Sequence, residues 1–112
     1  MTRPLVYIAH ALSGDWDANI ARAREYVRVA ALCGWAPVAP YLTFYGLLHE
    51  PEDRAIGLEI DFACVCACEQ LWLCGETISA GMVEELRAFD GDTILRVRNP
   101  GLVPDVPGRF GE

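Results

Sequence analysis

The segment ISAGMVEELRAFDG, residues 78–91, places two carboxylates side by side on a predicted helix. With a helical advance of about 100° per residue, Glu84 points almost directly away from the apolar face that Met82 and Phe89 share. Glu85 falls on the flank of that face, within one turn of both apolar residues. A carboxylate in such partly buried surroundings can act as a nucleophile or as a general base.

Burial would raise the pKa of Glu85, and the nearby helix N-terminus would oppose that rise. A purely structural alternative is that Glu85 forms an ion pair with an arginine such as Arg87 or Arg28. Helical geometry by itself leaves both hypotheses open.

The first turn of the same helix offers groups that suit a sugar or a phosphate. Ser79 is a good helix cap, and Gly81 lets a ligand approach the backbone closely. The free amides around Met82, together with the helix dipole, favour hydroxyl or phosphate groups. The alternative is an ordinary capped helix.

Asp61 is the last charged residue before the apolar run FACVCAC. A carboxylate at this border is either buried with a partner, for which Arg54 is a candidate, or exposed at a cleft.

The first apolar run and the residues after it add further candidates. Tyr7 lies within the run, and His10 follows near its end, where it could bind a substrate or donate a proton. Gly14 permits close packing on a ligand, but the G-x-G-x-x-G pattern of dinucleotide sites is absent. The aromatic residues of 41–45 could stack on a base or pack in the core.

Alternating apolar and amphipathic segments indicate how these side chains are positioned. Predicted strands cover residues 4–11, 35–40, 69–75 and 92–97, predicted helices cover 15–32, 51–68 and 79–91, and a loop is predicted for 40–50. The second helix becomes apolar on all sides, which predicts that its end is buried.

This alternation predicts an α/β fold, a Rossmann-like or flavodoxin-like three-layer sandwich with a parallel sheet of four to five strands. Ligands of such sheets bind beyond the carboxyl ends of the strands. The predicted site is therefore formed by loops 10–16, 40–50 and 75–81.

Length and charge restrict the possible functions. A chain of 112 residues predicts one domain, residues 1–98, followed by an irregular Pro- and Gly-rich tail, residues 99–112. A net charge of −7 argues against a nucleic acid polymer as partner. We find no targeting segment and no membrane span, so we expect a cytoplasmic protein that does not bind membranes.

The five cysteines are best interpreted as reduced, buried thiols. The spacing C-x-C-x-C differs from the C-x₂-C spacing of zinc sites, and no histidine lies nearby in the sequence. We therefore expect no metal and no organic cofactor.

The order of motifs resembles the nucleoside 2-deoxyribosyltransferase superfamily, and within it a branch of small, mostly uncharacterised bacterial and phage proteins. The resemblance covers residues 5–97 and rests on VYIAHALSGD, GWAPVAP, LEID, EQLWLCG and SAGMVEE, in that order.

The resemblance implies a transfer or hydrolysis reaction at the N-glycosidic bond of a (deoxy)nucleoside or its monophosphate. In that chemistry Glu85 attacks C1′, and Asp61 works near the base and the leaving group. Ser79 contacts the 5′ group of the sugar, with Gly81 and Met82 beside it, while Tyr7 orients the glutamate. The resemblance also implies a homo-oligomer.

The chain departs from the superfamily pattern in its first loop. His10 occupies a position that is usually small, and no arginine is present there to hold a phosphate. The segment 40–50 lacks the acidic and amide residues that read the base. A rival hypothesis is therefore a module on the same fold that binds a nucleotide or a nucleotide-derived ligand without turning it over.

Overall fold

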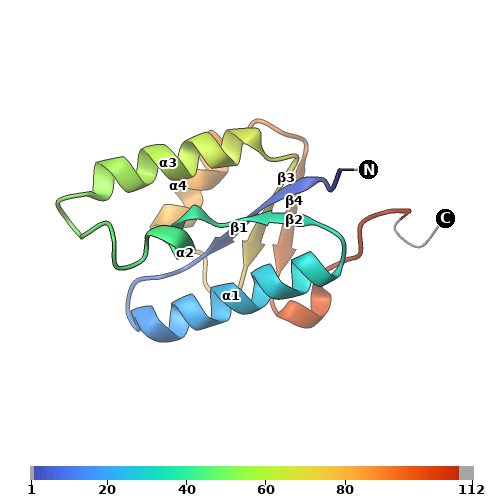
Figure 1. Ribbon diagram of the computed structural model, residues 1–112, viewed down its shortest axis with the longest axis horizontal. Helices are drawn as coiled ribbons and strands as arrows, with labels where there is room; N and C mark the ends of the chain where they lie inside the picture. Colours follow the sequence, from blue (N-terminus) through green and yellow to red (C-terminus); the bar gives the residue numbers. More distant parts are fainter. Residues whose placement is uncertain (1, 109–112) are drawn as a thin grey trace.

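A parallel sheet of four strands, in the order β2-β1-β3-β4, forms the centre of the protein (Figure 1). The computed structural model describes residues 2–108. Its strands are β1 (Leu5–His10), β2 (Ala36–Val38), β3 (Gln70–Cys74) and β4 (Thr93–Val97). The predicted fold class and all four predicted strands are confirmed.

Helices cover both faces of the sheet, as predicted. They are α1 (Trp16–Leu32), α2 (Pro40–Phe44), α3 (Arg54–Ala67) and α4 (Ala80–Ala88). Figure 1 shows α1 on one face, with α3 and α4 on the other. Right-handed crossovers require this arrangement, because the chain steps outward from β1 to β2 and then reverses direction to reach β3 and β4.

Strand alternation divides the core into two layers. Val6 and Ile8 of β1 point toward α1, whereas Tyr7 and Ala9 point toward α3 and α4. Trp72 of β3 joins the first layer, where its ring meets that of Trp35 edge to face at a centroid distance of 5.0 Å. The candidate nucleophile helix α4 therefore lies on the Tyr7 side of the sheet.

The chain after β4 packs back over the first layer. It contains one short 3₁₀ helix, η1 (Pro100–Leu102), and otherwise no regular structure up to residue 108. The Trp35 indole donates to the Pro104 carbonyl at 2.8 Å, and the Val106 amide donates to the Cys33 carbonyl at 3.0 Å. The rest of the predicted irregular tail, residues 109–112, lies outside the described residues.

The segment between β2 and α3 corrects two predictions. Residues 40–44, predicted as part of a loop, form the helix α2 with Pro40 in its first turn, a position that favours proline. The next helix begins at Arg54 and not at Pro51, because the Asp53 carboxylate accepts the His49 amide at 2.9 Å and closes a turn before it.

The apolar end of α3 is not wholly buried, so that prediction is also wrong. Only one face of the helix meets the sheet, and along it Val65 is fully buried, while Ala63, Cys66 and Ala67 are exposed. The expectation of buried thiols is correct for Cys68 and Cys74 but wrong for Cys66.

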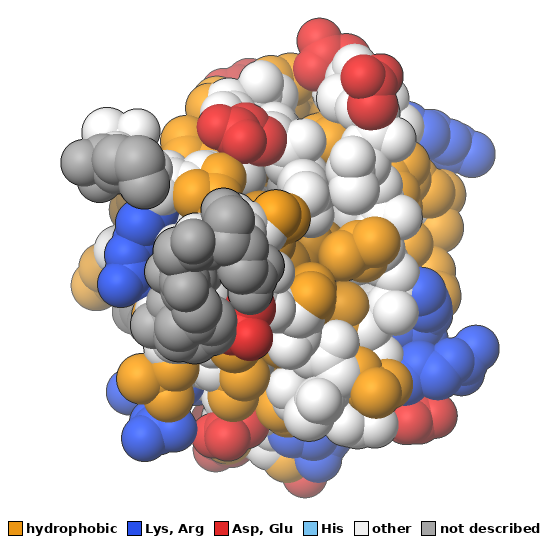
Figure 2. Space-filling view, turned by 90° about the vertical axis from the view of Figure 1, so that its right-hand side faces the viewer, with side chains coloured by type: hydrophobic (Ala, Val, Ile, Leu, Met, Phe, Trp, Pro, Cys, Tyr) orange, Lys and Arg blue, Asp and Glu red, His pale blue; other side chains and the backbone are white. Residues whose placement is uncertain are grey.

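The two ends of the sheet differ in character. Figure 2 shows the end at which the strands begin, where hydrophobic side chains lie in scattered patches and charged side chains lie mostly at the margins. The candidate site lies at the other end, where the strands finish. None of the helices in residues 2–108 combines the length and the apolar character needed to cross a bilayer.

Candidate active site

The carboxyl ends of β1 and β3 mark the point where the strand order reverses. These strands are neighbours in register, with His10 opposite Cys74, and the chain leaves them toward opposite faces of the sheet. Ligands of doubly wound folds bind at this position. A cavity of about 490 Å³ opens beside it, which is a suitable size for a small molecule.

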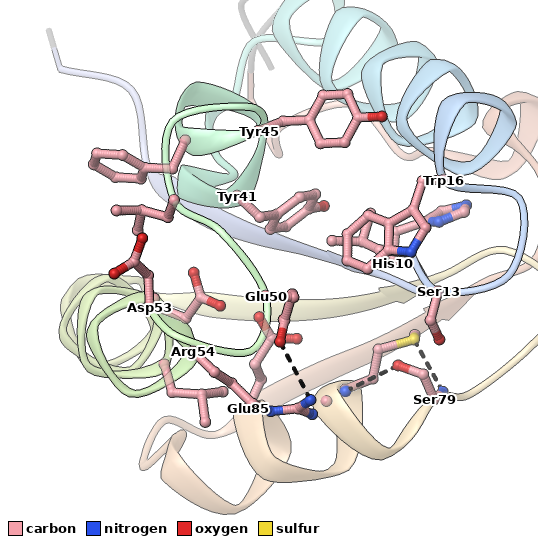
Figure 3. A pocket seen from close by; sticks show the side chains of 18 of the residues that line it. His10, Ser13, Trp16, Tyr41, Tyr45, Glu50, Asp53, Arg54, Ser79 and Glu85 are labelled. Atoms are coloured by element: carbon pink, nitrogen blue, oxygen red, sulfur yellow. Dashed lines mark hydrogen bonds and ion pairs between the residues drawn. The ribbon is translucent and has the colours of Figure 1, made fainter.

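Side chains from all three predicted loops line this first cavity, together with α3 and α4. Figure 3 shows the aromatic side chains of Trp16, Tyr41 and Tyr45 on one side. Ser79 and Glu85 lie on the opposite side. The cavity thus faces an aromatic wall on one side and polar, acidic groups on the other.

Glu85 occupies the position that the helical geometry predicts. It is 6% exposed, lies on the buried stripe of α4 between Met82 and Phe89, and accepts a hydrogen bond from the Tyr7 hydroxyl. Its neighbour Glu84 is exposed and forms the ion pair with Arg87, at 2.9 Å. The hypothesis that Arg87 pairs with Glu85 is therefore wrong.

Asp61 lines the same cavity as Glu85, from the opposing helix α3. It lies one turn before the buried Val65, on the face of α3 that meets the sheet. The proposed partner Arg54 instead pairs with Glu50 at 3.5 Å. Two helices that follow different strands thus bring their carboxyl groups to one hollow.

Burial dominates the ionisation of this carboxyl pair. It raises the pKa of Glu85 to about 8, and although the Tyr7 hydrogen bond lowers that pKa, the charge of Asp61 raises it further. Burial also raises the pKa of Asp61 to about 6, against the lowering effect of the Tyr7 hydroxyl. Near neutral pH the pair therefore holds about one proton and one negative charge between its two members.

Tyr7 is the group that both carboxyls share. It is fully buried behind Glu85, and burial, followed by the charges of Glu85 and Asp61, raises its pKa far above the ordinary value. The phenol therefore remains protonated and keeps donating. Tyr7 is a positioning residue, because it holds the Glu85 carboxyl without lining the cavity.

His10 closes the sheet end of the cavity. It is 8% exposed, its Nδ1–H donates to the Ala11 carbonyl at 2.7 Å, and its ring packs on Tyr26 with a centroid distance of 5.6 Å. Burial lowers the pKa of His10, which keeps the imidazole neutral. Gly75 allows this placement, because it has a φ of +89° and a Cβ there would lie 3.0 Å from Nε2 of His10.

The start of α4 faces the first cavity through Ser79, Gly81 and Met82. Ser79 is the helix cap, and its hydroxyl oxygen accepts the Met82 amide at 3.2 Å. Its hydroxyl hydrogen can still donate to a ligand. A Cβ at Gly81 would meet only the Ser79 hydroxyl oxygen, at 3.8 Å, so the space above this glycine is open to a ligand.

Asp53 and Gly57 also line the cavity, although neither was predicted as a site residue. A signal for them existed, because Asp53, Gly57 and Asp61 follow one another at four-residue spacing and so share one face of α3. The loops that carry Trp16 and Tyr45 were predicted to form the site, but their pairing, with stacked ring centroids 6.2 Å apart, had no signal in the sequence, because the two residues come from separate segments.

Metal-ligating side chains do not gather in the part of the chain that the structure describes: no group of three or more His, Cys, Asp or Glu could hold an ion.

The chain matches a known protein family over most of its length. The family described as a domain of unknown function (DUF7768) matches residues 4–97, which include every strand and all the candidate site residues named above. No curated protein and no solved structure is significantly similar to the chain.

Proposed function

We propose that this chain, which belongs to the DUF7768 family, cleaves or transfers the N-glycosidic bond of a (deoxy)nucleoside or its monophosphate. The proposal relates it to the nucleoside 2-deoxyribosyltransferase superfamily. One observation carries it: the buried carboxyl group of Glu85 and the half-buried one of Asp61 line one cavity, and Tyr7 binds Glu85 from behind. Paired carboxyls with different environments suit an oxocarbenium-like transition state.

In the first step a Glu85 oxygen forms a bond to C1′ of the sugar while the C1′–N bond breaks. The electron pair of that bond goes to the base nitrogen, which receives a proton from Asp61 or from a water that Asp61 orients. Tyr7 supports the ionised form of Glu85, since its hydrogen bond lowers the pKa of this carboxyl.

In the second step water or a second base attacks C1′, and the sugar–Glu85 ester bond breaks. Asp61, now ionised, accepts the proton of the attacking group. The first step requires that the pair hold one proton in total, with Asp61 protonated and Glu85 ionised. This is the minor arrangement of the singly protonated pair, because Glu85 has the higher pKa. The rate should therefore fall below about pH 6 and above about pH 8, where the pair becomes doubly protonated or fully ionised.

The walls of the cavity suit the two halves of such a substrate. The aromatic side chains of Trp16, Tyr41 and Tyr45 offer faces on which a base can stack. Ser79 and the open backbone at Gly81 lie on the side of Glu85, where sugar hydroxyls would be bound. C1′, which joins base and sugar, would then face the carboxyl pair.

The test is release of free base from a panel of nucleosides and their monophosphates, followed by chromatography. We expect release by the wild type, its loss in Glu85→Ala and Glu85→Gln, and its retention in Glu84→Gln. The last variant is a matched control, because Glu84 is the adjacent glutamate and is exposed. Equal release by the wild type and Glu85→Gln would exclude the glycosyl-enzyme mechanism.

One observation favours the second candidate, a nucleotide-binding module. With a pKa of about 8, Glu85 is largely protonated at neutral pH and can donate a hydrogen bond to a bound ligand. Binding that raises the unfolding temperature without base release, and that persists in Glu85→Gln, would support the module. If no nucleoside or nucleotide shifts the unfolding temperature, both functions are excluded.

A further inference from the structure

A second cavity, of about 590 Å³, lies at the same edge of the sheet on the α1 side. The two cavities share His10 and Ser13 in their walls, so they adjoin at the carboxyl end of β1. The chain from Gly75 to Thr77 lines the second cavity and leads directly to Ser79 in the first. A ligand that extends past Ser79 along this loop would enter the second cavity.

Two arginines from different elements line the second cavity. Arg22 comes from α1 and Arg98 follows β4. Within residues 2–108 the ion pairs are Arg54 with Glu50 and Arg87 with Glu84, so neither of these arginines is neutralised by a carboxylate there. Guanidinium groups recognise phosphate oxygens by paired hydrogen bonds.

Arg22 is held in position before any ligand arrives. Its Nη2 donates to the Asn19 side-chain oxygen at 2.8 Å, and the Asn19 amide donates to the carbonyls of Leu12 and Ser13 at 2.8 and 3.1 Å. One side chain thus ties the arginine to the loop that separates the cavities. Arg22 also lies close enough to His10 for its charge to lower the pKa of that imidazole.

The second cavity is not simply basic, because Glu25 and Glu76 also line it. The two carboxylates cancel the charge of the two arginines, so the cavity does not attract a free anion by its net charge. A phosphate must instead be recognised through hydrogen bonds from the guanidinium groups. A ligand that is already bound in the first cavity holds its phosphate close to the arginines. The phosphate then binds at a high effective concentration, even though the second cavity has no net positive charge.

We propose that the second cavity binds the outer phosphate of a nucleotide that carries a pyrophosphate group, while the ribosyl part of the same nucleotide occupies the first cavity. This inference rests on the proposed function for the placement of the sugar. Ser79 borders only the first cavity, so we expect a 5′-monophosphate bound there to end short of Arg22 and Arg98. A second phosphate extends the ligand past His10 toward them.

The test compares the binding of a 2′-deoxynucleoside, its 5′-monophosphate and its 5′-diphosphate, for each of the four bases, by isothermal titration calorimetry. We expect the diphosphate to bind roughly tenfold more tightly than the monophosphate, as charge-assisted hydrogen bonds imply. The double variant Arg22→Gln/Arg98→Gln should lose this preference and bind the nucleoside unchanged. Glu76→Gln should tighten diphosphate binding several-fold.

Arg24→Gln is the matched control, because Arg24 is an exposed arginine of α1 that does not line the second cavity. It should leave the diphosphate preference intact. Equal affinity for mono- and diphosphate in the wild type, an unchanged preference in the double variant, or no binding of any of the three ligands would overturn the inference.

Base release separates this inference from the proposed function. Release with the same kcat/KM from mono- and diphosphates, insensitive to both arginines, leaves the function standing and overturns the second subsite. A diphosphate preference that depends on Arg22 and Arg98, without release of base from any substrate, supports the subsite and excludes the enzyme.

Discussion

The ionisation of Glu85 makes a prediction about folding that needs no substrate. Its pKa rises from an ordinary value of 4.5 to about 8 in the folded protein, mainly because of burial. Below pH 4.5 the carboxyl is protonated in both the folded and the unfolded state, so its ionisation does not change the free energy of unfolding. As the pH rises toward 8, the unfolded state ionises first, so the free energy of unfolding decreases.

The size of this loss follows from the shift. One pKa unit corresponds to about 1.4 kcal/mol. The ionisation of Glu85 therefore lowers the free energy of unfolding by up to about 5 kcal/mol as the pH rises from 4.5 to about 8. A small domain has a total stability of about 5–15 kcal/mol, so the effect is large enough to measure. Glu85→Gln keeps the size of the side chain and an acceptor for Tyr7 but cannot ionise.

We therefore expect Glu85→Gln to gain stability relative to the wild type as the pH rises. The assay is urea unfolding at about pH 5 and about pH 8.5, followed by tryptophan fluorescence. Trp35 and Trp72 are buried and report on the core. Glu84→Gln should differ from the wild type by less than about 1 kcal/mol at both pH values, because its ion pair with Arg87 is exposed.

A constant difference in stability between the wild type and Glu85→Gln across this pH range would contradict this prediction. That result would mean that the Glu85 carboxyl ionises in the folded protein as readily as in the unfolded chain. A ligand cavity lined by a desolvated carboxyl would then be excluded as well.

Three further predictions concern neighbouring positions. Tyr7→Phe removes the hydrogen bond that lowers the pKa of Glu85, so the alkaline limb of the pH–rate profile should move to higher pH, which a profile of kcat/KM measures. Gly81→Ala should keep or slightly raise the unfolding temperature, since its Cβ has room, but weaken nucleotide binding in calorimetry by filling ligand space. Gly75→Ala should cost roughly 1–3 kcal/mol in urea unfolding, because it forces a side chain into a left-handed backbone conformation against His10, and an unchanged stability would contradict that geometry.

Much of the local structure could be predicted because its causes are local. Four short apolar runs form the four strands. Asp15 caps α1 and Ser79 caps α4, and each side chain accepts a hydrogen bond from the backbone amide three residues later. The contrast between Glu84 and Glu85 follows from helical periodicity and is seen in the structure as an exposed and a buried carboxyl.

The errors lie where local signals are weak. The five-residue helix α2 is too short to show a period, and it is held by the Tyr41 hydroxyl, which donates to the Ile8 carbonyl at 2.5 Å, a partner 33 residues away. The apolar end of α3 does not reveal which side meets the sheet, so Cys66 could not be recognised as exposed.

The order of the elements, the fold class and the direction in which Glu85 points on its helix can therefore be predicted from the residues alone. The contact of Glu85 with Tyr7, 78 residues away, and the cavity that it shares with Asp61 arise only when the chain folds. The same holds for the hollow that Arg22 and Arg98 line. Strand pairing and helix packing set these contacts between distant segments, whereas periodicity and capping depend on residues only three or four positions apart.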